Sequence, residues 1–113
     1  MATDIRAHLH LADTSAQKAR LVLDAVRGKA AVDAATTLHF MNKKAARLVV
    51  KLLNSAIANA EENFGVSRED LVVSQIFADE GPTRKWRRFG ARGRFKPMLR
   101  RSAHITVILR ERE

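Results

Sequence analysis

Strict alternation of apolar and polar residues near the two ends of the chain predicts two half-buried strands. The first covers residues 4–11, and its apolar side consists of Ile5, Ala7, Leu9 and Leu11. The second covers residues 104–110, where every other residue is again aliphatic. A third strand is predicted over residues 71–78, because that run is rich in Val, Ile and Phe.

Between the strands predicted at 4–11 and 71–78, the apolar residues recur with the period of a helix. Thr14 and Gln17 have the spacing of a capping box, which predicts a helix over residues 17–27 that Gly28 ends. A shorter helix is predicted over residues 32–41. A long third helix follows, with Asn42 as its cap. Its wide apolar side makes it the central packing helix and comprises Ala45, Val49, Leu52, Leu53, Ala56 and Ala60.

The order of these elements predicts an α+β fold, with three helices packed on a small antiparallel three-stranded sheet and a long protruding β-hairpin. A length of 113 residues suits a single domain. Its globular body would comprise residues 1–83 and 102–113, and residues 84–101 would form the extended hairpin. Gly90 and Gly93 can supply the turn, and arms of about nine residues reach roughly 30 Å.

The positive charge is concentrated in the predicted hairpin. The chain has 21 Lys and Arg against 12 Asp and Glu. Residues 84–101 contain nine of the basic residues and no acidic one, so the remaining 12 basic and 12 acidic residues balance. Such a block is typical of a surface that binds a polyanion. Its basic residues are Arg84, Lys85, Arg87, Arg88, Arg92, Arg94, Lys96, Arg100 and Arg101.

Aromatic residues are interleaved with these charges. Trp86, Phe89 and Phe95 could stack on unpaired bases or fill space in a groove. The alternative is a solvated loop in which the aromatic residues are incidental. A loop gains little from three aromatic side chains, so the pattern favours nucleic acid as the partner.

A second basic patch lies on the long predicted helix, and its members are Lys43, Lys44, Arg47 and Lys51. Basic charge at a helix N-terminus opposes the helix dipole, which indicates an external anion. A solvated helix face is the alternative interpretation. Four residues of the preceding helix region could extend the patch: Lys18, Arg20, Arg27 and Lys29.

Several classes of function are disfavoured. The chain has no Cys, which excludes disulfides, zinc–thiolate sites and thiol catalysis. No apolar run approaches the ~20 residues of a membrane span, and the N-terminal sequence lacks the pattern of a secretory signal. His8 and His10 form an H-x-H pair without a further ligand at a metal-binding spacing. Asp79 and Glu80 suit the entrance of the hairpin better than acid–base catalysis. We therefore expect no enzyme activity, no metal and no cofactor.

Four stretches of the sequence together resemble the bacterial large-subunit ribosomal protein L twenty-two family. They are QKARLVLDAVRGKAAVDA at 17–34, KKAARLVVKLLNSAIANAEENFG at 43–65, DEGPT at 79–83 and RSAHITVIL at 101–109. The resemblance implies a structural constituent of the large ribosomal subunit that binds 23S-type rRNA and supports subunit assembly. It implies neighbouring large-subunit proteins as partners, a cytoplasmic location, and neither a membrane nor a homo-oligomer. The lack of an N-terminal extension favours a bacterial protein.

The resemblance also implies that the hairpin lines the nascent-peptide exit tunnel. Carried over by position, its tip is Arg88, Phe89, Gly90, Ala91, Arg92 and Gly93, next to the nascent peptide. Hairpin changes in the family can affect the response to macrolides. Many bacterial members have Pro and Arg where this chain has Phe89 and Gly90, so the side chain nearest the tunnel constriction differs.

The implied rRNA-binding residues combine the hairpin with the helical patch. They are Arg84, Lys85, Trp86, Arg87, Arg88, Arg92, Arg94, Lys96, Arg100, Arg101, Lys18, Lys29, Lys43, Lys44, Arg47 and Lys51. Two alternatives to an rRNA-binding protein remain. One is a DNA architectural protein that inserts basic β-arms into the minor groove, and the other is an enzyme acting on RNA. The first lacks a central Pro or aliphatic wedge, and the second lacks an acid–base constellation.

Overall fold

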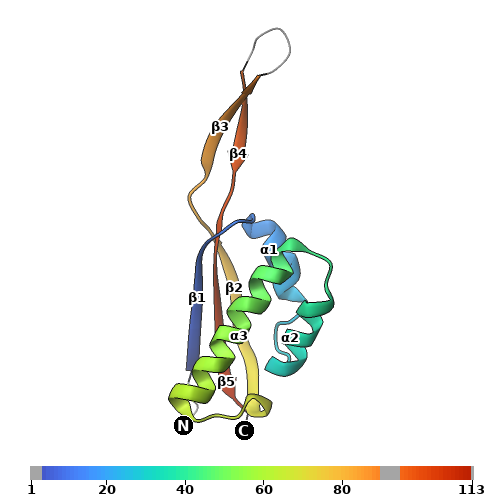
Figure 1. The fold of residues 1–113 in the computed structure, drawn as a ribbon, viewed down its shortest axis with the longest axis vertical. Helices are drawn as coiled ribbons and strands as arrows, with labels where there is room; N and C mark the ends of the chain where they lie inside the picture. The colour runs from blue at the N-terminus through green and yellow to red at the C-terminus, as the bar shows by residue number, and fades with distance from the viewer. Residues whose placement is uncertain (1–3, 90–94, 113) are drawn as a thin grey trace.

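The structure is a computed structural model that describes residues 4–89 and 95–112, with side chains outside 85–98. Three α-helices lie on one face of a three-stranded sheet, and a two-stranded ribbon projects from its end (Figure 1). The elements are β1 (Asp4–Ala12), α1 (Ala16–Asp24), α2 (Ala31–Phe40), α3 (Lys44–Phe64), the 3-10 turn η1 (Arg68–Asp70), β2 (Leu71–Glu80), β3 (Arg84–Phe89), β4 (Phe95–Arg100) and β5 (Ala103–Glu111).

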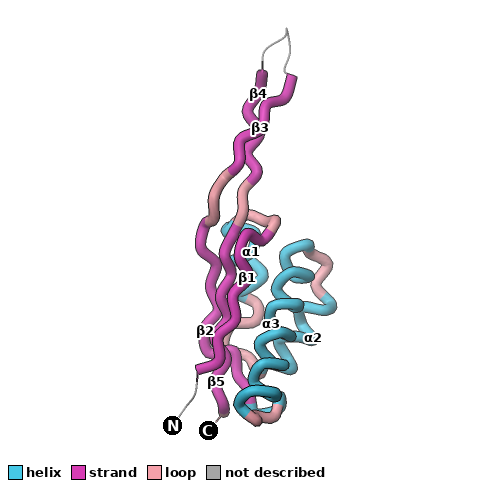
Figure 2. The backbone as a smooth tube through the Cα atoms, turned by 60° about the vertical axis from the view of Figure 1, so that its left-hand side comes forward, coloured by secondary structure: helices cyan, strands magenta, loops and turns pink. Residues whose placement is uncertain are grey.

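The sheet has the order β1-β5-β2, and both pairings are antiparallel. The central strand β5 therefore pairs with the first strand and with the strand that precedes the hairpin. Its residues 105, 107 and 109 face the helices and are fully buried. The second view shows that all three helices lie on the same side of the sheet (Figure 2). The predicted α+β fold is confirmed.

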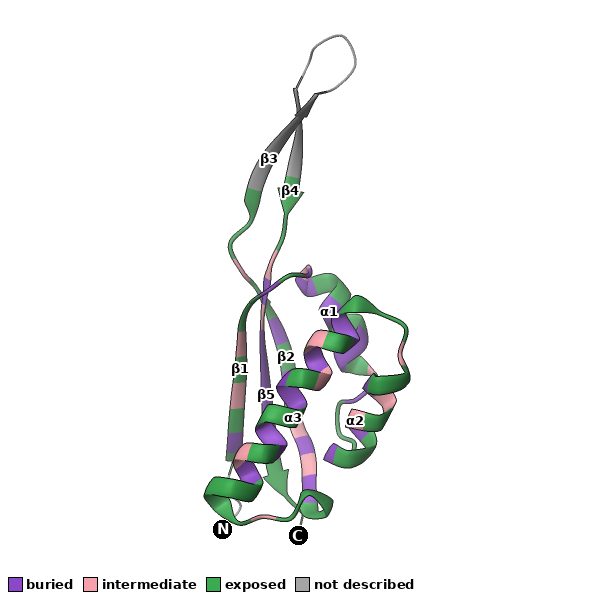
Figure 3. Ribbon diagram, in the orientation of Figure 1, coloured by how far each residue is buried: buried purple, intermediate pink, exposed green. Residues whose placement is uncertain are grey.

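The core lies between α3 and the sheet. The six apolar residues predicted for the inner side of this helix are all buried, and the arc of Lys43, Arg47 and Lys51 is exposed (Figure 3). Gly65 ends the helix with a φ of 65°, a conformation that costs glycine little. The helical period therefore predicted both sides and the end of α3 correctly.

The predicted helix caps differ from the observed ones. Ser15, not Thr14, caps α1, and its hydroxyl accepts a hydrogen bond from the backbone N–H of Lys18. Thr14 is instead buried. The cap of α3 is Lys43 rather than Asn42, and no side chain bonds to this helix end. The capping patterns located the starts of α1 and α3 correctly, but the residue that caps each helix is one position later than predicted.

Two further predictions are corrected. Helix α1 ends at Asp24, so Gly28 lies beyond it, where its N–H donates to the Val73 carbonyl at 3.1 Å. Leu11 was expected on the buried side of the first strand but is 60% exposed. The register of β1 shifts between Leu9 and Ala12, and Leu11 has a φ of 56°. This bulge turns Ala12 inward in its place.

The ribbon continues the direction of the sheet. β2 extends beyond the predicted residues 71–78 through Asp79 and Glu80, and three residues then lead into β3. On the return, Arg101 and Ser102 connect β4 to β5. The molecule consequently measures 63 × 24 × 18 Å along its principal axes. The described arms of the hairpin, 84–89 and 95–100, therefore extend away from the core, where another molecule can surround them.

Candidate nucleic-acid interface

The two arms of the hairpin place like charges opposite each other. In the register of β3 and β4, Arg84 pairs with Arg100 and Arg88 with Lys96. Both Arg84 and Arg100 are exposed. Directly opposite like charges destabilise a strand pair, and a two-stranded ribbon is marginal on its own. An external polyanion would relieve this repulsion.

The root of the hairpin forms one side of an open groove of about 1050 Å³. Its walls come from the start of α1, the start of α3, and the two connections that join the ribbon to the sheet. These four segments are distant in the sequence and meet only in the fold. Five basic residues line the groove, and each is exposed: Lys18, Lys43, Lys44, Arg100 and Arg101.

Two acidic residues, Asp13 and Glu80, also line this groove. The Lys44 Nζ donates a hydrogen bond to the Asp13 carboxylate at 2.9 Å, and Arg100 Nη2 lies 3.8 Å from the same oxygen. This hydrogen bond, with the positive charge of Lys44 and then of Arg100, lowers the pKa of Asp13. Five cations against two carboxylates leave the groove positive, so it favours anions.

The start of α3 adds to this positive potential. Its cap residue, Lys43, makes no side-chain hydrogen bond to the first turn, and that turn contains no acidic residue. The first N–H groups of a helix lack partners within the helix and attract anions. Basic residues here are unfavourable for the helix dipole. The arrangement is therefore suited to a ligand that brings its own negative charge.

The basic patch on α3 is continuous with the groove. Lys43 lines the groove, and Arg47 and Lys51 follow on the same exposed side of the helix. Lys29 is separate from them. It lies in the loop after α1, where its carbonyl accepts a hydrogen bond from the Val73 N–H at 2.9 Å near the far end of β2. The fold thus unites most of the predicted helical patch with the hairpin, and leaves Lys29 apart.

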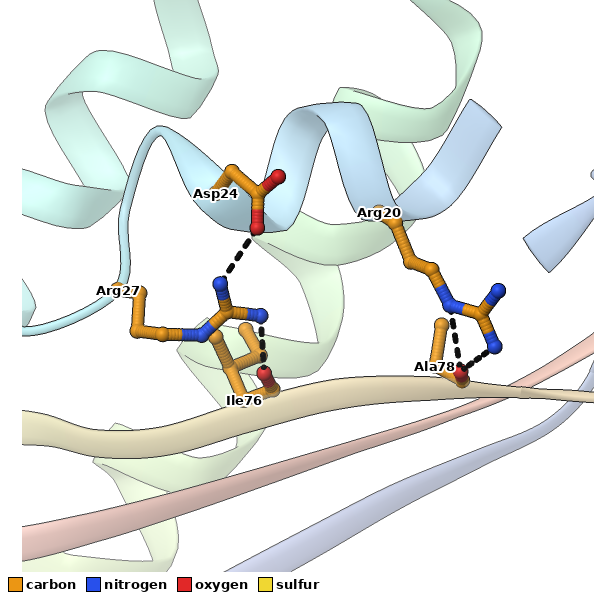
Figure 4. Close-up of polar contacts among 5 residues, drawn as sticks. All are labelled: Arg20, Asp24, Arg27, Ile76 and Ala78. Carbon is orange, nitrogen blue, oxygen red and sulfur yellow. Dashed lines mark hydrogen bonds and ion pairs between the residues drawn. The ribbon is translucent and has the colours of Figure 1, made fainter. Parts of the chain in front are cut away.

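Arg20 and Arg27 bind the protein itself (Figure 4). Arg20 donates to the Ala78 carbonyl through Nε at 3.2 Å and Nη2 at 3.0 Å. Arg27 donates to the Ile76 carbonyl at 2.9 Å and pairs with Asp24. Both carbonyls belong to β2, an edge strand of the sheet. These arginines satisfy and cover that edge, which makes them structural rather than an extension of the patch.

The histidines of β1 lie on the sheet face away from the helices. The His8 Nδ1 lies 3.0 Å from the Thr106 hydroxyl, and the His10 ring meets the His104 ring edge to face at 5.4 Å. Across residues 4–89 and 95–112, no three metal-ligating side chains gather as a cation site would require. Nor is any helix of that part long and apolar enough to cross a membrane.

Asp13, Leu21 and Leu99 are among the groove residues that the sequence did not reveal. Asp13 lies in a short loop, and Leu21 and Leu99 resemble ordinary apolar positions. Only their convergence in space distinguishes them, and no local pattern could have shown it. The predicted hairpin residues Lys85 to Arg88 and Lys96 have described backbones only. Positions 90–94 fall outside the described residues, so most of the predicted tip, together with Arg92 and Arg94, does too.

Comparison with known protein families gives a match over most of the chain. The sequence model of the family described as Ribosomal protein L22p/L17e matches residues 7–110. The match covers all but the first six and last three residues, and so includes every helix, both arms of the hairpin, the whole of β2 and most of β1 and β5.

Proposed function

Because the chain belongs to the ribosomal protein L22p/L17e family, it is a non-enzymatic structural constituent of the large ribosomal subunit, and we propose that its hairpin and root groove hold the rRNA. Large-subunit rRNA and proteins are its partners, and translation is the process it serves. The phosphate contacts are assigned to the hairpin arms, the groove and the exposed side of α3.

The observation that carries this proposal is the meeting of five basic residues from three separate segments at the hairpin root. An extended ribbon needs a fixed base if its tip is to reach a defined place. Phosphates bound in the groove would hold the ribbon and the helical body at the same time. Arg and Lys contacts to phosphate set position and orientation without reading sequence, which is the task of a structural rRNA-binding protein.

The hairpin tip is proposed to lie in the wall of the nascent-peptide tunnel. Residues 88–93 lie in the middle of the hairpin sequence, between the start of β3 at Arg84 and the end of β4 at Arg100, whereas the groove lies at the root of these two strands. This separation supports a division of labour: anchoring by the root, and contact with the nascent peptide by the tip. Assembly of the subunit would then depend mainly on the body and the stem.

Competitive incorporation into subunits tests the groove. The triple variant Lys43→Gln, Lys44→Gln, Arg101→Gln and the wild-type chain are expressed together, and their ratio in purified large subunits is measured by mass spectrometry. We expect the triple variant to be depleted at least tenfold. Arg112→Gln serves as the control, because Arg112 is exposed at the opposite end of the body, where its N–H bonds to Asp70. Equal incorporation of the triple variant and the wild type would refute the assignment.

A further inference from the structure

Two leucines of the root groove are exposed although the groove is otherwise charged. Leu21 of α1 is 61% exposed and Leu99 of β4 is 50% exposed, and both line the groove. A single exposed leucine needs no explanation. Two exposed leucines that converge from separate elements among five cations need an explanation, because phosphate binding does not require aliphatic side chains.

The leucines and the cations are placed to act on one ligand. Lys18 and Leu21 are three residues apart on α1, so they lie side by side on the same face of the helix. Leu99 and Arg100 are consecutive in β4, and both also line the groove. The ligand must therefore present negative charge and an apolar surface within a few ångströms of each other.

An unpaired nucleotide meets this requirement, and a duplex does not. An A-form helix presents phosphates and 2′-hydroxyls while its base faces are stacked inside. Single-stranded loops and bulges can splay a base out, so that its flat face is free to pack against a side chain. The volume of about 1050 Å³ is comparable to that of sites for drug-sized molecules, ~300–1,000 Å³.

We propose that the root groove binds an unpaired nucleotide of the large-subunit rRNA, with its base packed against Leu21 and Leu99 and its phosphates on Lys18, Lys44 and Arg101. This inference rests on the proposed function and specifies the RNA element that the groove takes. The excess of cations over Asp13 and Glu80 favours RNA over an apolar peptide segment. The groove would then fix the hairpin root at one particular bulge or loop of the rRNA, rather than at any stretch of the rRNA backbone.

Site-specific crosslinking within intact large subunits tests this inference. A diazirine-bearing aliphatic residue replaces Leu21 in one chain and Leu99 in another, and the crosslinked nucleotide is mapped by reverse transcription. We expect both positions to crosslink to the same unpaired nucleotide or to its immediate neighbour. Crosslinks to a neighbouring protein, crosslinks to paired nucleotides, or no crosslink at either position would each overturn the inference.

A binding measurement with the free chain complements the crosslinks. The double variant Leu21→Ala, Leu99→Ala should bind deproteinised large-subunit rRNA about tenfold more weakly, because the base loses its apolar contact with both leucines. Leu11→Ala is the matched control, since Leu11 is 60% exposed but does not line the groove. Equal affinity of the double variant and the control would contradict the proposal.

The two proposals fail separately. If Leu21 and Leu99 crosslink to protein while the triple charge variant is still depleted from subunits, the nucleotide site is wrong and the rRNA-binding groove stands. If the triple charge variant incorporates normally, the proposed function itself is wrong.

Discussion

The carboxylate of Asp13 lies 2.9 Å from the Nζ of Lys44, and both residues line the groove at the hairpin root. Arg100, the last residue of β4, lies 3.8 Å from the same carboxylate oxygen. Asp13 thus connects the loop after β1, the start of α3 and the base of the hairpin. In the free protein, Lys44 and Arg100 are directed toward the Asp13 carboxylate. An rRNA phosphate must therefore compete with this carboxylate for the two cations.

Replacing Asp13 by Asn should therefore strengthen binding to rRNA. The substitution frees Lys44 and Arg100 for phosphate, so we expect affinity to rise about twofold to fivefold, the range of one exposed ion pair. The dependence of log K on log salt should also steepen by up to ~0.9 for each additional phosphate contacted. Fluorescence anisotropy at a series of KCl concentrations measures both. Glu62→Gln removes the same charge from the far end of α3 and is the control; an equal effect there would mean that only net charge matters.

The ion pair should also be visible in the titration of Asp13 itself. Its pKa lies below the ordinary value of 3.8, chiefly because Lys44 donates a hydrogen bond to it. Lys44→Ala should raise this pKa toward 3.8, and Lys43→Ala should leave it nearly unchanged. Since the folded pKa is the lower one, the pair favours the folded state above pH 3.8 and loses this effect as the pH falls through the folded pKa. Carboxyl-detected NMR gives the pKa, and an identical value with and without Lys44 would contradict the contact.

Neighbouring basic residues on α1 should have opposite roles. Lys18 lines the groove, whereas the Arg20 guanidinium bonds to the Ala78 carbonyl. Arg20→Ala should lower the free energy of unfolding by about 1 kcal/mol, because a strand carbonyl loses a charged donor, and should leave the salt dependence of rRNA binding unchanged. Lys18→Ala should leave the free energy of unfolding unchanged and should reduce the salt dependence of rRNA binding. Urea unfolding and anisotropy separate the two effects, and a loss of rRNA binding with Arg20→Ala at full stability would show that this arginine contacts RNA.

The contrast between Lys18 and Arg20 illustrates what the sequence could predict. Alternation in β1 and β5 and the helical period of α3 identified the core, because those patterns follow directly from which side is buried. Arg20 and Arg27 bond to backbone carbonyls that lie 58 and 49 residues away in the sequence. No local pattern could therefore distinguish these structural arginines from Lys18, which lines the groove. The groove combines residues near positions 13–21, 43–45, 80–83 and 99–102, and only the folded chain brings them together.

Local chemistry was also insufficient at the helix starts and at Leu11. Thr14 and Ser15 are both good capping residues, and the choice between them depends on Thr14 being buried. The bulge that exposes Leu11 follows from the register of β1 against β5. Each of these differences comes from long-range packing, which overrides a preference worth about 1 kcal/mol.

Shortening the hairpin tip should affect the tunnel more than assembly. The basic residues that line the groove all lie outside 88–93, so the anchors remain when these six residues are removed. A strain carrying only the shortened chain should build large subunits in near-normal amounts. Its macrolide sensitivity, or its stalling on regulatory nascent peptides, should change. Failure of subunit assembly would make the tip an assembly determinant, and unchanged assembly with unchanged tunnel responses would place the tip outside the tunnel.

The salt dependence of binding to deproteinised large-subunit rRNA tests most directly whether the groove and the hairpin hold phosphates. If about six cations of the chain meet phosphates, the slope of log K against log salt should be roughly −4 to −5. The groove variant Lys43→Gln, Lys44→Gln, Arg101→Gln should reduce its magnitude by about 2 to 3, and the hairpin variant Arg92→Ala, Arg94→Ala by about 1 to 2. A nearly flat slope for the wild-type chain, or the same slope for all three chains, would contradict phosphate binding at these residues.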